Sequence, residues 1–531
     1  MVTNEKHSGM KIMHSSSLNS NKHVQTHIQQ QIPTSTEPDI IHRYDEYTHF
    51  AMEWKGIMEE YDWAYNNVHR RERSNDTFNK EYFHLSSTSH SRIFINGDKN
   101  NFKKGDYIHI VIKTKDKYGN YRDKGGDMFQ GVMLNAQLQK STAGRVYDYG
   151  NGTYSIYFYA AWAGDANISI YMVYTREMIL MFNNNRLRKE YLQWTGVYGE
   201  DPNSEEVTCK LIREGVWEDK CSYGNRNSFG NIVFVCDKPK TFSCKDIMSV
   251  TSFTGKTVNG ADAKKERLLL SYLFNNQQNT LLTTMPMRIA VKDTSANVPT
   301  LPMCGPDLPI PVTDGYWTDD STYVSLVCRS QKWTQAQAHK CLANVSLALY
   351  GDSTLGQFGQ SLRFRYNYSN FIVVSKGFFP HGPTFWTIGY ESEFLDGINK
   401  TLCDSKQIVF VMNIIFHYTE WSFMLYIERL FATKLAVERL FMRCPTAKVF
   451  FKVSHPRSVL GGTQSRFDVV WVAFDMDRMI RRVFGGMGVH FLGVWDMSIS
   501  HFSSLQVHLA PELIDQQINL LLSYICPDLV D

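Results

Sequence analysis

A serine follows a glycine and an aspartate where an apolar run ends in the second half of the chain. The run at 344–350 predicts a short strand, and Gly351, Asp352 and Ser353 come directly after it, before a polar stretch compatible with a helix. In a parallel sheet, this position is the carboxyl edge where ligands usually bind. A helix N-terminus offers N–H donors to an oxyanion that forms when Ser353 attacks an ester. We therefore expect Ser353 to be an acyl-transfer nucleophile, with Gly351 and Asp352 lining the oxyanion or substrate site.

The alternative interpretation of this tripeptide is a plain turn in which Asp352 or Ser353 caps the helix. A serine nucleophile also needs a base. His508 is the predicted base, because it lies in a loop between the strand predicted to end at Trp495 and the last helix. Asp496, directly after that strand, is the predicted acid that orients the imidazole. The alternatives are a surface histidine and an aspartate that caps a turn.

Two more polar residues lie at or near the end of a neighbouring predicted strand, 407–416. Asn413 lies within the run and His417 follows it. His417 is a predicted donor to the oxyanion or the substrate. A partly buried histidine with ordinary partners is the alternative for His417.

The elements that must position these residues alternate between strands and helices. Apolar runs predict strands at 344–350, 370–375, 407–416, 447–453 and 488–495. An amphipathic helix is predicted between the third and fourth runs, ending before Pro445, and the last helix is predicted to open at Pro511. This alternation predicts a parallel sheet in a three-layer α/β domain.

The first half of the chain follows a period of two instead. Ile108, Ile110 and Ile112 recur at every second position and so lie on one face of a strand, and Gly, Asn and Asp turns separate such runs, which predicts a β-sandwich. Five prolines between Pro299 and Val312 predict an extended linker. We therefore expect five segments. They are a disordered polar N-terminus at 1–40, a helical or irregular extension at 41–90, a β-sandwich domain at 91–298, a linker at 299–312 and an α/β domain at 313–531.

Composition and cysteine usage bear on compartment and partners. The net charge of +3 gives no reason to expect a nucleic-acid partner, and no run of 18 apolar residues predicts a membrane span. The ten cysteines form no Cys-x-x-Cys and no His-Glu-x-x-His accompanies them, so neither a metal site nor a cofactor is predicted. Buried thiols and disulfides both remain open.

Six tripeptides fit the N-glycosylation pattern, and together with the even number of cysteines they favour a secreted protein or one in the ER or Golgi lumen. Their asparagines are Asn75, Asn151, Asn167, Asn344, Asn367 and Asn399. The first 40 residues hold no apolar segment of the kind that a signal peptide needs. A cytosolic protein with reduced thiols is therefore the alternative.

Segments 349–357, 417–453 and 493–526 resemble the neurexophilin and PC-esterase domain (NXPE) family. The resemblance extends from about residue 90 to the end of the chain and is strongest in the last part. It implies an N-terminal immunoglobulin-like, neurexophilin-like β domain and a C-terminal PC-esterase domain of the SGNH/GDSL hydrolase type. Relatives of the second kind act on acyl esters of glycans in the secretory pathway, as acetyltransferases or esterases. Neurexophilin-like domains bind extracellular partners.

Position by position, the resemblance makes Ser353 the nucleophile and His508 the histidine. PC-esterases carry an aspartate three residues before that histidine, where this chain has Leu505, and Leu509 stands where the family's proline is expected. For the family's third block, whose asparagine is a donor to the oxyanion or the substrate, the resemblance offers two residues. Asn413 lies in the right strand, whereas His417 is the better match. An aliphatic side chain cannot orient an imidazole, but serine–histidine pairs without an acid can still work.

The motif and its departures from the family pattern leave two candidate functions. The first is an enzyme in which Ser353 attacks a glycan acyl ester or another acyl ester. The second is a catalytically inactive secreted or cell-surface protein that binds an extracellular protein through its neurexophilin-like domain. The domain division also separates the cysteines into four between Cys209 and Cys244 and six between Cys304 and Cys526. Both numbers are even, so we predict disulfides within each half and none between them.

Overall fold

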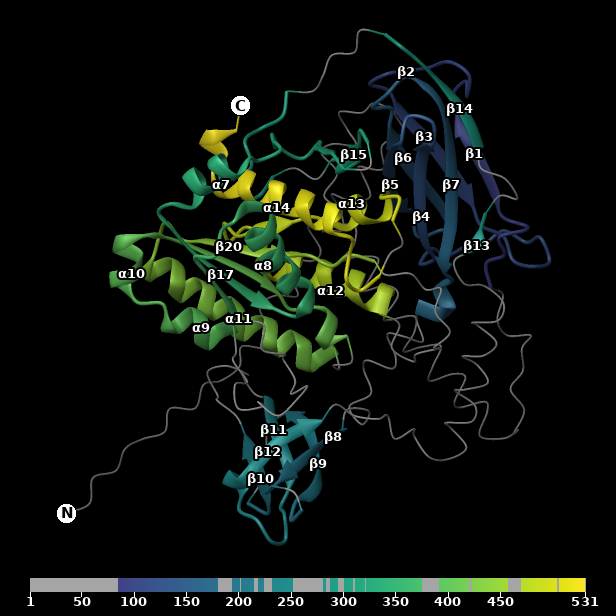
Figure 1. Cartoon of the computed structure of the whole chain (residues 1–531). Helices are drawn as coiled ribbons and strands as arrows, with labels where there is room; N and C mark the ends of the chain where they lie inside the picture. The colour runs from purple at the N-terminus through teal and green to yellow at the C-terminus, as the bar shows by residue number, and fades with distance from the viewer. Residues whose placement is uncertain are drawn as a thin grey trace, which may run out of the picture. The chain divides into compact units, whose positions relative to one another are not determined.

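The computed structural model of the 531-residue chain contains several β-sheets and a set of helices, and the protein is multidomain (Figure 1). The structure describes residues 85–179, 193–200, 202–213, 218–223, 232–251, 280–282, 287–294, 300–308, 311–319, 321–374, 391–419, 423–456, 469–503 and 506–530. The predicted polar N-terminus and nearly all of the predicted extension at 41–90 lie outside these ranges.

The first sheet contains the period-two segments of the N-terminal half. Its main path runs β1-β3-β6-β5-β4-β7-β14-β2, and β5 pairs with β6 through its second part and with β4 through its first. Ile108, Ile110 and Ile112 are fully buried on one face of β3, as the alternation predicts. The strands are β1 (Arg92–Asn96), β2 (Phe102–Lys103), β3 (Tyr107–Lys113), β4 (Met128–Asn135), β5 (Lys140–Asp148), β6 (Thr153–Tyr159), β7 (Gly164–Tyr174), β13 (Thr280–Leu281), β14 (Met287–Lys292), β15 (Gly315–Trp317) and β16 (Tyr323–Ser325).

A second, smaller sheet follows, which the sequence pattern does not separate from the first. It is antiparallel, in the order β10-β11-β9-β8-β12. Cys209 and Cys236 are opposite each other on β9 and β11 and form a disulfide, and a second disulfide joins Cys221 to Cys244. Its elements are β8 (Gln193–Tyr198), β9 (Glu205–Arg213), β10 (Lys220–Tyr223), β11 (Ile232–Asp237), the 3-10 helix η3 (Cys244–Asp246) and β12 (Ile247–Thr251).

The third sheet holds the five strands predicted in the C-terminal half. All neighbouring strands are parallel, in the order β18-β17-β19-β20-β21. The strands are shorter than predicted at several ends; the third ends at Asn413 rather than at 416. Their bounds are β17 (Val345–Gly351), β18 (Phe371–Val374), β19 (Gln407–Asn413), β20 (Lys448–Lys452) and β21 (His490–Leu492).

Helices lie on both faces of this sheet, with α8 and α14 on one face and α9 and α11 on the other (Figure 1). Leu347 and Leu349 of β17 belong to the core beneath α8 and α14, whereas Ala348 and Tyr350 belong to the core beneath α11 and α12. The helices are α7 (Gln335–Leu342), α8 (Ser353–Tyr366), α9 (Glu391–Gly397), α10 (Lys400–Ser405), η4 (Phe416–Tyr418), α11 (Phe423–Arg443), α12 (Val469–Phe484), α13 (Trp495–Ile499), α14 (Pro511–Ile525) and η5 (Pro527–Leu529).

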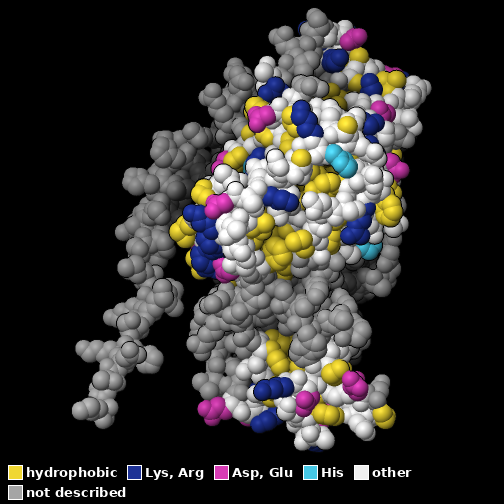
Figure 2. Space-filling model, turned by 60° about the vertical axis from the view of Figure 1, so that its left-hand side comes forward, with side chains coloured by type: hydrophobic (Ala, Val, Ile, Leu, Met, Phe, Trp, Pro, Cys, Tyr) yellow, Lys and Arg dark blue, Asp and Glu magenta, His cyan; other side chains and the backbone are white. Residues whose placement is uncertain are grey.

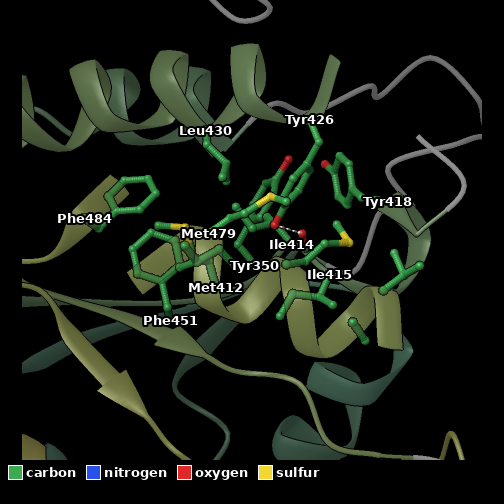
Figure 3. Packing of buried hydrophobic residues seen from close by; sticks show 14 of the residues in the cluster. Tyr350, Met412, Ile414, Ile415, Tyr418, Tyr426, Leu430, Phe451, Met479 and Phe484 are labelled. Atoms are coloured by element: carbon green, nitrogen blue, oxygen red, sulfur yellow. Dashed lines mark hydrogen bonds between the residues drawn. The ribbon is translucent and has the colours of Figure 1, made fainter. Parts of the chain in front are cut away.

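The core under α11 is rich in aromatic and sulfur side chains. Figure 3 shows Tyr350, Met412 and Phe451 of the sheet together with Leu430 of α11 and Met479 of α12. Burial of this apolar face stabilises the sheet. The carboxyl ends of its strands therefore have fixed positions. None of the described helices is long and apolar enough to cross a membrane.

All ten cysteines are paired in five disulfides, and none of these pairs joins the two predicted halves of the chain. The C-terminal half contains Cys304–Cys328, Cys341–Cys526 and Cys403–Cys444. The prediction of bridges within halves is thus confirmed, and five disulfides fit a secreted or lumenal protein. On the face of the molecule in Figure 2, Lys and Arg side chains are interspersed with Asp and Glu side chains, in keeping with the small net charge.

Candidate active site

The strand order of the parallel sheet creates a switch point between β17 and β19. The chain passes from β17 to β18 on one side and then crosses to β19 on the other. In open parallel sheets, ligands bind beyond the carboxyl ends of the strands at such a point. Gly351 and Asn413 end these two strands and are paired in register. The first residues of α8 therefore stand at the position where a ligand is expected.

Gly351 is required by the close approach of β17 to β19. A Cβ atom built on Gly351 would lie 2.9 Å from the Asn413 carbonyl oxygen and 3.2 Å from its backbone nitrogen. These are backbone atoms of the neighbouring strand, so they cannot move away without disturbing the ladder. The glycine therefore allows β17 to approach β19 closely directly before Ser353.

We expect Gly351→Ala to lower the free energy of unfolding by about 1–3 kcal/mol, the usual cost of overpacking a close contact. Gly356→Ala is the matched control, because a Cβ atom at that position of α8 meets nothing within 4 Å. Alanine there should be neutral or slightly stabilising. Urea unfolding of both variants tests this, and equal stabilities would contradict the close approach.

Asp352 is the N-cap of α8. Its backbone is extended, and its Oδ1 atom accepts hydrogen bonds from the Thr354 backbone nitrogen at 2.9 Å and from the Thr354 hydroxyl at 2.6 Å. Asp352 thus has the capping role that was the alternative interpretation of this tripeptide. Because the cap begins the helix at Ser353, it also directs the first N–H groups of α8 toward the sheet edge.

Ser353 and His508 are joined by a hydrogen bond. The Ser353 Oγ and His508 Nε2 atoms lie 2.8 Å apart, and both side chains are exposed. With the imidazole neutral and its proton on Nδ1, the hydroxyl donates to Nε2, which is the contact that a general base needs. The chain thus brings together the two residues that the sequence singles out as nucleophile and base, across 155 positions.

Gln357 holds the histidine loop against α8. Its side-chain oxygen accepts from the Leu509 backbone nitrogen at 3.2 Å, and its Nε2 atom donates to the Leu509 carbonyl at 2.9 Å. Gln357 lies one turn after Ser353, so the two hydrogen bonds fix the loop next to the nucleophile. The sequence analysis missed this residue; its spacing from Ser353 on one helix face is the signal that could have found it.

Asn413 lies beside the nucleophile and is buried. Its Nδ2 atom donates to the Thr354 hydroxyl at 3.0 Å, and its Oδ1 atom accepts from the Ile415 backbone nitrogen at 3.2 Å. Among the described residues, these contacts leave one N–H of the amide for another acceptor. His417 lies in the 3-10 helix η4, and its side chain is outside the described part of the chain.

Asp496 does not contact His508. It begins α13 with Trp495, and its carboxylate lies 3.6 Å from the Arg145 guanidinium of β5, which also binds Asp314. Within the described ranges, the His508 side chain has no hydrogen bond to a carboxylate. Leu505, at the family's aspartate position, lies outside those ranges.

Two buried basic residues near the end of β20 lie behind the pair, and the sequence analysis did not single them out. Burial lowers the pKa of Lys452 to about 8, although nearby Asp352 acts in the opposite direction. Burial lowers the pKa of His455 well below its usual value, and the charge of Lys452 adds to this effect. Since Lys452 lies next to the end of the predicted strand 447–453, its place at the carboxyl edge could have been inferred.

Five of the six predicted glycosylation asparagines lie in the described part of the chain, and all five are exposed. They are Asn151, Asn167, Asn344, Asn367 and Asn399. Asn75 is outside the described residues. Asn399 is also the N-cap of α10, where its side chain accepts from the Leu402 backbone nitrogen at 3.0 Å.

The fold and site define a multidomain protein whose parallel-sheet domain carries a hydrogen-bonded serine–histidine pair at its switch point. A family model described as "NXPE family member 4-like, C-terminal domain" matches residues 374–526, and one described as "Neurexophilin" matches residues 72–255. The chain belongs to the NXPE family. His508 lies within the first match, and Ser353 lies before it.

Two solved structures share limited similarity with the chain. The crystal structure of the Lin-41 filamin domain is 13% identical, with 16% of this chain and 80% of that chain covered and a TM-score of 0.14. The structure of a family two carbohydrate esterase from Clostridium thermocellum in complex with cellohexaose is 10% identical, with 82% and 99% covered and a TM-score of 0.24. With TM-scores this low, neither similarity carries an argument about the chain.

Proposed function

We propose that the protein is a secretory-pathway enzyme that hydrolyses or transfers an acyl ester of a glycan. The observation that carries this proposal is the 2.8 Å contact between Ser353 Oγ and His508 Nε2 at the switch point of a parallel sheet. A nucleophile in hydrogen-bond reach of its base is the arrangement that acyl transfer needs. Membership of the NXPE family supports the same reaction class.

The reaction begins when Ser353 Oγ attacks the carbonyl carbon of the ester and His508 Nε2 accepts the hydroxyl proton. The tetrahedral oxyanion receives hydrogen bonds from N–H groups at the start of α8 and from the remaining N–H of the Asn413 amide. His508 then gives its proton to the departing alcohol, and an acyl-enzyme remains on Ser353. Water or a sugar hydroxyl, deprotonated by His508, attacks the acyl carbonyl and releases Ser353.

The finer fold and the segment roles belong to the same proposal. We assign residues 313–531 to a three-layer α/β domain of the SGNH/GDSL-like PC-esterase type, although β15 and β16 at its start extend the first sheet through β5. This domain is linked through 299–312 to an immunoglobulin-like, neurexophilin-like region at 91–298. Helices on both faces of the parallel sheet support the first assignment, and the Neurexophilin match supports the second. The five disulfides and the five exposed sequon asparagines support passage through an oxidising, glycosylating compartment.

A binding protein without catalysis is the second candidate function. It is favoured by the absence, within the described ranges, of a carboxylate on His508. Loss of this carboxylate costs serine hydrolases on the order of 10⁴ in rate. In that case the region matched by the Neurexophilin model would bind an extracellular protein, and the esterase-like site would have no catalytic activity.

Hydrolysis of 4-nitrophenyl acetate by the purified chain separates the two functions. We expect turnover above the buffer rate that falls to background in Ser353→Ala. Ser361→Ala is the matched control, because Ser361 lies on the same helix but contacts Asp515 instead of His508. Equal rates for the native chain and Ser353→Ala would overturn the enzymatic proposal. O-acetylated glycans, tested next, identify the natural substrate class.

A further inference from the structure

Three buried polar atoms near the serine–histidine pair have no hydrogen-bond partner among the residues that the structure describes. They are Asp352 Oδ2, Lys452 Nζ and His455 Nδ1. The three side chains are only 3%, 1% and 1% exposed. Buried polar groups are usually paired, so three such atoms in neighbouring residues point to a functional arrangement. Two of the atoms are acceptors and the third belongs to a donor, so the set is complementary.

The donor and acceptor roles follow from the surroundings of His455. Its Nε2 atom lies 3.0 Å from the Val507 carbonyl oxygen, so Nε2 carries the proton and donates it. Burial, reinforced by the charge of Lys452, keeps the ring neutral by lowering the pKa of His455. The Nδ1 atom of His455 is therefore a hydrogen-bond acceptor, and the ring lies within electrostatic reach of Lys452.

Each end of this cluster adjoins one member of the catalytic pair. Asp352 caps α8 directly before Ser353, and its charge acts on Lys452. At the other end, His455 donates a hydrogen bond to the carbonyl of Val507, the residue directly before His508. The His455 ring also packs against Phe416, with ring centroids 4.9 Å apart, which restricts its orientation. Lys452 thus interacts electrostatically both with the cap of the nucleophile helix and with the histidine that binds the His508 loop.

We propose that His455, supported by Lys452, is a positioning residue for His508. It holds the backbone before His508, and so replaces the carboxylate that would otherwise orient the imidazole from position 505. This inference rests on the proposed function, since it assigns no role to His455 unless His508 is the base for Ser353. It explains how the pair stays in hydrogen-bond reach although Leu505 cannot hold the ring.

The test measures the rate constant for labelling of Ser353 by a fluorophosphonate in the full chain. His455→Phe keeps a ring but loses the N–H donor, and should slow labelling about 100-fold, the effect of a misplaced catalytic group. His455→Gln keeps an N–H donor and should restore most of the rate. His490→Phe is the matched control, since His490 is a buried histidine on β21 that stacks on Phe450. Its labelling rate should be unchanged.

A second variant and a pH profile separate positioning from folding. Lys452→Met should slow labelling and remove an inflection near pH 8, where the native Lys452 loses its proton. The charged and titratable groups that act on Lys452 and His455 are Asp352 and His508. Lys448→Met is its control, because the Lys448 amine binds the Tyr524 and Ile525 carbonyls at the other end of β20.

The labelling results distinguish a failure of the positioning role of His455 from a failure of the proposed acyl-transfer function. Unlabelled native protein would overturn the proposed function, and the inference with it. A labelled native chain with an equally reactive His455→Phe would overturn the inference alone, as would His455→Gln as slow as His455→Phe. If His455→Phe lowers the unfolding temperature, the test rests on Lys452→Met instead. A pH profile of labelling in Lys452→Met that equals the native profile would then overturn the inference.

Discussion

Replacing His508 by alanine is expected to lower the rate of 4-nitrophenyl acetate hydrolysis by about 10⁴-fold or more, because removal of the base from a serine–histidine pair costs that much in serine hydrolases. The only hydrogen bond of its side chain in the described part of the structure goes to Ser353. The loss should therefore appear in the chemical step, as a fall in kcat with little change in KM.

His339→Ala is the control for this experiment. His339 likewise makes one side-chain hydrogen bond, from Nε2 to the Tyr366 carbonyl at 2.8 Å, and lies on α7. Its substitution should leave kcat unchanged. If His508→Ala retains the native rate while folded, the proton of Ser353 has another acceptor, and the role of His508 as base is wrong.

The second large effect concerns the Cys341–Cys526 disulfide, which joins α7 to the end of α14. Its cysteines are 185 positions apart, whereas those of Cys304–Cys328 are only 24 apart. Loop-closure entropy predicts that removing the long-range bridge lowers the free energy of unfolding by about 5 kcal/mol and the short one by about 3 kcal/mol.

Urea unfolding of the two paired Cys→Ala variants, under conditions that keep the other bridges oxidised, measures both losses. The Cys341/Cys526 variant should unfold at the lower urea concentration. A larger loss for the Cys304/Cys328 variant would show that the native contacts of each bridge, not the length of the loop that it closes, determine its effect.

Local patterns in the sequence predicted the elements of the site well. The apolar run before Gly351 predicts β17, and the polar stretch after Asp352 predicts α8. The alternation of Ile108, Ile110 and Ile112 likewise marks the buried face of β3. These features depend on neighbouring residues, so the sequence contains the information directly.

Long-range pairing was harder to infer. Asp496 was predicted to follow directly a strand that ends at Trp495, but β21 ends at Leu492 and Asp496 lies in α13. Its charge faces Arg145 of β5, a contact with a distant part of the chain that no local pattern indicates. The sheet formed by β8–β12 has the same alternation as the first sheet, so periodicity alone does not separate the two. Lys452 was overlooked because a lysine at a strand end reads as exposed, whereas the fold buries it.

The most direct test of the central claim is covalent labelling of the folded, full-length chain with a fluorophosphonate, followed by peptide mapping by mass spectrometry. The account predicts one phosphonyl group on Ser353, no labelling of Ser353→Ala and greatly slowed labelling of His508→Ala. A folded chain that takes up no label at Ser353, or takes it up equally without His508, would contradict the account.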